Sequence, residues 1–133
     1  MEITIVLFKH GTVDEYNRLK GEFWDERFHP IIRAFLLDLG LFTVRMFDKQ
    51  LVVTSVFRSE EENRAIGGVP GSSHCDWRAA DVRSSVFTDT ERLAILEYAK
   101  RYGSLIHFIY EVGGTGAHFH ANVNKSALIR LGL

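Results

Sequence analysis

Apolar residues recur every three or four positions along two long stretches of the chain, which is the spacing of one face of an α-helix. Gly40 follows the first stretch and Gly103 follows the second, and glycine commonly stands just beyond the end of a helix. Two shorter segments carry helix-start signals, one of them Ser59 followed by three glutamates. Helices are expected over residues 12–20, 25–39 and 60–66, and from Thr88 or Asp89 to Tyr102.

Strands are expected where β-branched and aromatic residues alternate with polar ones or run together. The segments of this kind are residues 1–8, 51–57, 79–83, 105–112 and 118–124. The glycine-rich residues 113–116 join the last two strands and predict a hairpin. Because helices and strands do not alternate regularly, we expect an α+β fold with a mainly antiparallel sheet and flanking helices.

Composition and charge narrow the class of protein. The 133 residues, 46% apolar and 25% charged, are enough for one domain (residues 1–133) with one hydrophobic core. A formal net charge of −1 offers no general attraction to nucleic acid, so no such partner is expected. No run approaches the roughly 20 apolar residues that cross a membrane, and the first residues lack the features of a signal peptide. We therefore expect a monomer, made in the cytoplasm, with no membrane partner.

Histidines and acidic residues gather in the second half of the chain. His118 and His120 are two positions apart on a predicted strand, so their side chains face the same way, about 6–7 Å apart. Upstream, His74 is followed by two carboxylates, Asp76 and Asp81. Two imidazoles and one carboxylate make up the three protein ligands of a catalytic zinc site, which keeps one position for water. The residue types therefore indicate a metal centre.

The region from residue 51 to residue 123 carries a spaced series of motifs, namely Val53-Thr54-Ser55-Val56-Phe57-Arg58-Ser59, Asn63, Gly67-Gly68, Ser72-x-His74, Ala79, Asp81 and His118-x-His120. Together these motifs closely resemble the peptidase M15 family of D-Ala-D-Ala carboxypeptidases and related phage endolysins. The resemblance implies the fold group that this family shares with hedgehog signalling domains, whose metal site exists without the same activity.

The same resemblance assigns roles to the residues of the metal centre. It implies that His74, Asp81 and His120 hold a zinc ion. It gives Glu111 the role of catalytic carboxylate, and it makes His118 a hydrogen-bond donor to the transition state. A hairpin between the last two predicted strands brings Glu111 across the sheet to His118.

Other residues of the motifs concern the substrate or compete as ligands. Arg58 resembles the arginine that stabilises the developing oxyanion or the substrate carboxylate, and the Ser72 hydroxyl contacts substrate or orients the loop. Trp77 stands where the family usually has glycine, which predicts a changed backbone there, and its indole either stacks on substrate or packs internally. The family spacing favours Asp81 over Asp76 as ligand. Cys75 is a weak candidate because neighbouring side chains in an extended loop diverge.

The resemblance implies a zinc-dependent peptidase that acts on peptidoglycan stem peptides, as a D,D-carboxypeptidase or as an endopeptidase of the L-Ala-D-Glu type. It further implies action on the cell wall after release by a separate pore, or as part of a phage particle. The alternative is a catalytically inactive zinc-containing binding or structural module. The retained Arg58, Glu111 and His118 favour the enzyme, because a structural site needs none of them. A hydrolase of another substrate is a third interpretation.

Overall fold

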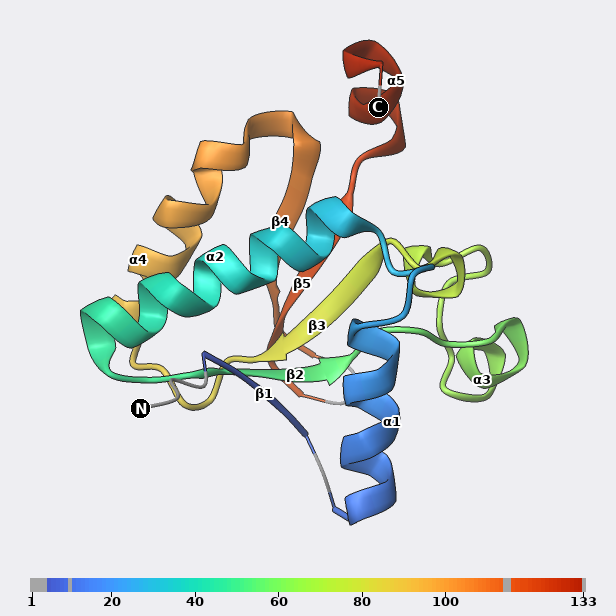
Figure 1. Ribbon diagram of the computed structural model, residues 1–133, viewed down its shortest axis with the longest axis horizontal. Coiled ribbons are helices and arrows are strands. Elements are labelled where there is room, and N and C mark those ends of the chain that lie inside the picture. The colour runs from blue at the N-terminus through green and yellow to red at the C-terminus, as the bar shows by residue number, and fades with distance from the viewer. Residues whose placement is uncertain (1–4, 10, 114–115, 133) are drawn as a thin grey trace.

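The structure, a computed structural model, describes residues 5–9, 11–113 and 116–132. Its centre is a five-stranded sheet in the order β1-β2-β3-β5-β4, shown in Figure 1. The strands are β1 (Val6–Phe8), β2 (Leu51–Ser55), β3 (Ala79–Arg83), β4 (Ile106–Glu111) and β5 (His118–Val123). Only β1 and β2 pair in parallel, and the other neighbours are antiparallel. The predicted α+β class with a mainly antiparallel sheet is confirmed.

Helices cover one face of this sheet and extend from its ends. In Figure 1, α2 crosses in front of the strands and α4 lies to the left, beside α2. The helical elements are α1 (Val13–Phe23), α2 (Pro30–Phe47), α3 (Glu60–Ala65), η1 (Ser73–Asp76), α4 (Asp89–Ala99), η2 (Lys100–Leu105) and α5 (Lys125–Leu131), where η denotes a 3-10 helix. None of the described helices combines the length and the apolar character that crossing a membrane requires.

The longest helix, α2, differs from its predicted bounds at both ends. It begins at Pro30, whose missing N–H costs little in a first turn, and it continues past Gly40 to Phe47. Gly40 does not end the helix because it serves another purpose. A Cβ at Gly40 would lie 2.9 Å from the carbonyl oxygen of Ile5, so only glycine lets the helix pass this close to the segment that leads into β1. The residue after Phe47, Asp48, caps the end of the helix in a left-handed conformation.

Other helical elements also depart from the sequence prediction. Helix α4 is capped by Thr88, the first of the two predicted caps, but ends at Ala99, where η2 takes over and contains Gly103 with φ +56. The short η1 and the C-terminal α5 were not predicted. A cap signal for α5 is nevertheless present in the sequence, since the Asn124 side chain accepts a hydrogen bond from Ala127 N at 3.2 Å.

The two faces of the central strands have different partners. On β3 and β5 every second side chain is buried in the hydrophobic core, namely Ala80, Val82, Phe119, Ala121 and Val123. They join buried residues of α2, namely Ile32, Phe35, Leu36 and Leu39. Because successive side chains of a strand point to opposite faces, the residues in between lie on the other face of the sheet. That second face carries the candidate site.

Candidate metal centre and cleft

The pairing of β5 with its two neighbours brings the predicted site residues together. In the register of β3 and β5, Asp81 lies opposite His120 and Arg83 lies opposite His118. In the register of β4 and β5, Glu111 lies opposite His118, as the predicted hairpin required. All five side chains start from the sheet face that points away from the core. Three adjacent strands therefore deliver two imidazoles, two carboxylates and a guanidinium to one surface.

His74 reaches the same place from η1 and is fixed by the segment after β2. The Ser72 hydroxyl accepts a hydrogen bond from His74 N at 3.2 Å and caps η1, so this serine orients the loop. Arg58 N donates to the His74 carbonyl at 3.3 Å, and the His74 ring Nδ1 lies 2.9 Å from the Val56 carbonyl oxygen. With 1% of its surface exposed, His74 has no freedom to turn away.

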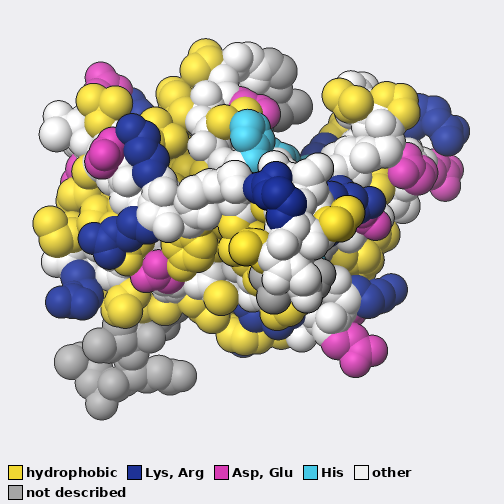
Figure 2. Space-filling view, turned by 90° about the horizontal axis from the view of Figure 1, so that it is seen from above, with side chains coloured by type: hydrophobic (Ala, Val, Ile, Leu, Met, Phe, Trp, Pro, Cys, Tyr) yellow, Lys and Arg dark blue, Asp and Glu magenta, His cyan; other side chains and the backbone are white. Residues whose placement is uncertain are grey.

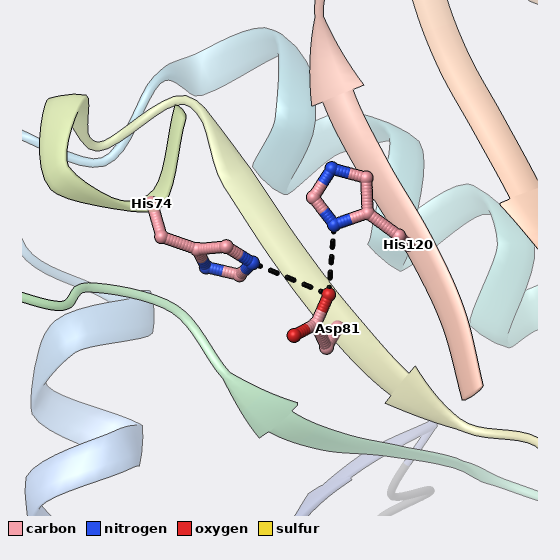
Figure 3. A group of neighbouring side chains, drawn as sticks. All are labelled: His74, Asp81 and His120. Carbon is pink, nitrogen blue, oxygen red and sulfur yellow. Dashed lines mark hydrogen bonds and ion pairs between the residues drawn. The ribbon is translucent and has the colours of Figure 1, made fainter. Parts of the chain in front are cut away.

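Figure 3 shows the two imidazoles pointing at the same carboxylate. Asp81 Oδ1 lies 3.2 Å from His74 Nε2 and 2.9 Å from His120 Nδ1. One candidate ligand atom from each residue lies within 4.8 Å of the others, which is close enough for the three to share one ion. The structure thus brings together His74, Asp81 and His120, the set that the family spacing singled out.

Hydrogen bonding to the far side of each ring determines which ring nitrogen is free. A carbonyl oxygen can only accept, so Nδ1 of His74 carries the hydrogen that binds Val56 and Nε2 keeps its lone pair. His120 Nε2 lies 3.2 Å from Asn122 Oδ1, and the tautomer that donates there leaves the Nδ1 lone pair facing Asp81. Both lone pairs then point at an oxygen of Asp81, which is itself an acceptor.

Three acceptors that face one another need a cation between them. His74 Nε2 is buried and, among the described residues, has no hydrogen-bond partner in spite of its 3.2 Å approach to Asp81 Oδ1. A divalent metal would satisfy this nitrogen and the two other donor atoms together. Two imidazoles with one carboxylate suit zinc, and the Val56 carbonyl and Asn122 amide supply the outer contacts that orient the rings of such ligands.

The electrostatic environment keeps Asp81 ionised. Burial alone would raise the pKa of Asp81, but the adjacent His120 and His74 rings outweigh burial and hold this pKa well below its usual range. Burial would likewise lower the pKa of His120, yet the adjacent Asp81 carboxylate gives a net rise in the metal-free protein. The carboxylate is therefore in the charged form that a metal ligand requires.

Glu111 and His118 form a second pair beside the three candidate ligands. His118 Nε2 lies 3.2 Å from Glu111 Oε2 and 3.7 Å from Asp81 Oδ1. Its other nitrogen, Nδ1, lies 3.1 Å from the carbonyl oxygen of Gly116, which fixes the ring. This geometry places a carboxylate and an imidazole next to the metal position without making them part of the ligand set.

These residues line a cleft of about 650 Å³. Figure 2 shows histidine side chains in a notch of the surface, with an acidic side chain beside them. The rims carry exposed apolar side chains, with Ile66 and Val69 from the segment after α3 and Val112 just after β4. Arg58 also lines the cleft, and its Nε is buried with no acceptor among the described residues. The cleft therefore combines apolar walls with a donor that lacks a partner.

The loop between the first two candidate ligands has the conformation that glycine would favour. Trp77 has φ +57 and ψ 28, in the left-handed region, so the expected change of backbone preference is not found. Its indole stacks on Phe57 with ring centroids 4.4 Å apart, and the Arg27 guanidinium lies over it at 4.5 Å. Trp77 is not among the residues that line the cleft, so its predicted contact with substrate stays a prediction.

The two competing ligands point elsewhere. The Asp76 carboxylate lies 2.8 Å from Arg78 Nε and 3.0 Å from Lys125 Nζ, so its charge is already paired. Burial, together with the nearby Glu60 carboxylate, raises the pKa of the Cys75 thiol, which disfavours the thiolate that a metal binds. Within the described ranges, the group that can share a metal ion contains neither residue.

Several contributors to the site were not identified from the sequence. Asn122 stands two residues after His120, so the polar alternation along β5 was a signal for it. The Val56 carbonyl is a backbone group and leaves no signal. Asn63 and Gly68, by contrast, belong to the motifs, which gave them no separate role. Asn63 is buried and donates from Nδ2 to the Val69 carbonyl at 2.8 Å, which shapes one wall of the cleft. The position of Asn63 also requires glycine at residue 68, because a Cβ there would lie 2.0 Å from Asn63 Oδ1.

Comparison with known proteins adds one finding to this geometry. Residues 30–120 match the model of a family described as Peptidase M15. The matched range includes His74, Asp81, Glu111 and His120, and it spans more than half of the 133-residue chain. Comparisons with curated proteins and with solved structures give no match.

Proposed function

The chain belongs to the peptidase M15 family, and from this premise we propose that it is a zinc-dependent peptidase that cleaves the stem peptides of peptidoglycan. Membership alone indicates a metallopeptidase of the zinc type. The observation that carries the proposal is the convergence of His74 Nε2, Asp81 Oδ1 and His120 Nδ1, three acceptors within 4.8 Å of one another. The peptidoglycan substrate is an extension that rests on the resemblance of the motifs.

The mechanism uses each residue for one task. Zinc bound by the three ligands would supply Lewis acidity that polarises the scissile carbonyl and acidifies water. Glu111 accepts the proton of the attacking water and passes it to the leaving amine. His118 donates a hydrogen bond to the oxyanion that develops on the carbonyl, and the Arg58 guanidinium stabilises the same charge. Glu111 and His118 are held 3.2 Å apart and next to Asp81, which supports these assignments.

The shape of the cleft supports a peptide that extends past the metal position. The cleft of about 650 Å³ continues into a second hollow that shares Arg58, Asp81 and His118 with it. A substrate can therefore occupy space on both sides of the bond that is cut. D,D-carboxypeptidase activity and L-Ala-D-Glu endopeptidase activity both fit this arrangement. The peptides released from peptidoglycan identify which bond is cleaved.

The test is hydrolysis of purified peptidoglycan by the zinc-loaded protein, followed by mass spectrometry of the released peptides. Glu111→Gln keeps the shape of the side chain but removes its basicity. It should keep the zinc content and lower the rate by about 10²–10⁴-fold. Glu97→Gln on the exposed side of α4 is the matched control and should leave the rate unchanged, because Glu97 pairs only with Lys100.

Two results would contradict the proposal. If the zinc-loaded protein releases no peptide and cuts no synthetic stem peptide, the chain is a zinc-containing binding module of the same family. If Glu111→Gln retains full activity, Glu111 is not the catalytic carboxylate and the mechanism must be reassigned.

A further inference from the structure

A second hollow, of about 360 Å³, lies next to the metal position on the same side of the sheet. It shares Arg58, Asp81 and His118 with the main cleft and then continues along β3 to Arg83 and towards Lys9, which follows β1. A substrate group placed in this hollow would therefore lie next to the metal position.

Three cations line this hollow and lack partners. The side chains of Lys9, Arg58 and Arg83 make no ion pair and no hydrogen bond to any of the described residues. Arg58 Nε is in addition buried, and a buried donor without an acceptor costs about 1–3 kcal/mol. The one carboxylate in the lining, Asp81, is already engaged by His74 and His120. The hollow therefore has unbalanced positive charge and a donor in need of an acceptor.

Arg83 is placed by the same strand geometry that places the metal ligand. It lies two residues after Asp81 on β3, so both side chains leave the same face of the sheet about 6–7 Å apart. It also lies opposite His118 in the register of β3 and β5. On the other side of the hollow, Lys9 N donates to the Val53 carbonyl at 2.8 Å, which ties the backbone of Lys9 to β2. The backbones of both cationic residues are thus held by the sheet.

We propose that Arg83 and Lys9 form a carboxylate-binding subsite that selects peptides with a free carboxylate next to the bond that is cut. This inference rests on the proposed function and specifies its substrate class. The planar guanidinium of Arg83 matches the two oxygens of a carboxylate, and Lys9 adds a second charge. Ser85 and Ser55 line the same hollow and offer hydroxyl groups to the same ligand.

Two sources can supply such a carboxylate, and paired peptides distinguish them. The first pair is an N-acylated peptide that ends in D-Ala-D-Ala, as the free acid and as the C-terminal amide. The second pair contains L-Ala joined to the amino group of D-Glu, with the chain continuing from the γ-carboxyl of D-Glu and the α-carboxylate either free or converted to an amide. Preference for the acid in the first pair indicates a carboxypeptidase, and preference in the second pair indicates an endopeptidase.

Binding is measured separately from turnover. In a Glu111→Gln background, calorimetry with the zinc-loaded protein gives the Kd of each peptide without cleavage. We expect the acid to bind roughly 10–100-fold more tightly than its amide in at least one pair, the range of a charge-assisted hydrogen bond. Arg83→Gln should reduce this ratio to near one, and the exposed Lys9→Gln should reduce it partly. Arg45→Gln, on α2 and outside the hollow, should leave it unchanged.

Each outcome decides the proposal. Equal binding of acid and amide in both pairs overturns the subsite, and so does an acid preference that survives in both Arg83→Gln and Lys9→Gln. If Arg83→Gln does not fold, Lys9→Gln alone carries the test, since Lys9 is exposed. Failure of the wild-type protein to cut any of the four peptides contradicts the proposed function, while the Kd ratios still decide the subsite.

Discussion

The two faces of strand β5 carry out different tasks with alternating residues. Phe119, Ala121 and Val123 are buried against the helices, whereas His118 and His120 line the cleft on the other side. The core face is held by apolar burial, which depends on shape and volume. The cleft face is held by polar contacts with named partners, and its central atoms repel one another until a cation is added. Mutation of a residue on the cleft face should therefore reduce metal binding and activity, whereas mutation of its neighbour on the core face should reduce stability.

Removal of a ligand should have the largest effect on function. His120→Ala takes away one of the three donor atoms, so we expect loss of bound zinc and a fall of hydrolysis to background, while the metal-free protein stays folded. Zinc content by elemental analysis and peptide release measure these two effects. His107→Ala on β4 is the matched control, since this exposed histidine lies outside the ligand group, and it should retain both. Zinc retained by His120→Ala would show that His120 is not a ligand.

The neighbouring Phe119→Ala should have the largest effect on stability. Phe119 is fully buried and stacks on Phe108 with ring centroids 5.2 Å apart. Truncation should lower the free energy of unfolding by about 3–5 kcal/mol. Urea unfolding of the metal-free protein measures this change, and Val112→Ala at the exposed rim of the cleft serves as its comparison. A loss below that of Val112→Ala would remove the contrast between the two faces.

A smaller effect is expected in the loop that carries His74. Trp77→Ala and Trp77→Gly both lose the contacts with Phe57 and Arg27, but only alanine keeps a Cβ in the left-handed backbone. The glycine variant should therefore be more stable than the alanine variant by about 1 kcal/mol. Thermal unfolding of the two variants measures the difference. A more stable alanine variant would mean that the loop gives up the positive φ once the indole is gone.

The smallest effect concerns a second partly buried carboxylate, Glu22 on α1. Burial raises the pKa of Glu22, and the hydrogen bond from Phe57 N at 3.4 Å only partly offsets it. Since the folded state favours the protonated form, ionisation of Glu22 costs stability at neutral pH, and this cost disappears as the pH falls below the ordinary glutamate pKa. Glu22→Gln should raise the Tm slightly at pH 7 and leave it unchanged at about pH 3–4. An equal shift at both pH values would rule out ionisation as the cause.

Asp81 shows why burial alone does not decide such a pKa. Both carboxylates are withdrawn from water, but Asp81 has two imidazoles as partners and Glu22 has one backbone N–H. The pKa therefore falls at Asp81 and rises at Glu22. The direction of the pKa shift of a buried carboxylate therefore depends on the partners that face it as well as on its burial.

The sequence predicted those parts of the fold and site that local patterns encode. The strand periods and the glycine-rich turn predicted β3, β4 and β5, and the resemblance of the motifs to the M15 family implied that His74, Asp81 and His120 converge. Gly40 was read as a stop because its close approach to Ile5 is a contact between segments far apart in the sequence. The parallel pairing of β1 with β2 and the contact of His74 with the Val56 carbonyl are likewise long-range and leave no local pattern.

The order of residues along β5 has one further consequence. His118 and His120 carry the same imidazole, and only the alignment of β5 with β3 puts His120 rather than His118 opposite Asp81. A slip of the two strands by two positions would keep apolar side chains on the core face, because strands repeat with period two. It would nevertheless put His118 in the proposed ligand position and move His120 away from it. The division of labour between two identical side chains thus depends on the backbone pairing that surrounds them.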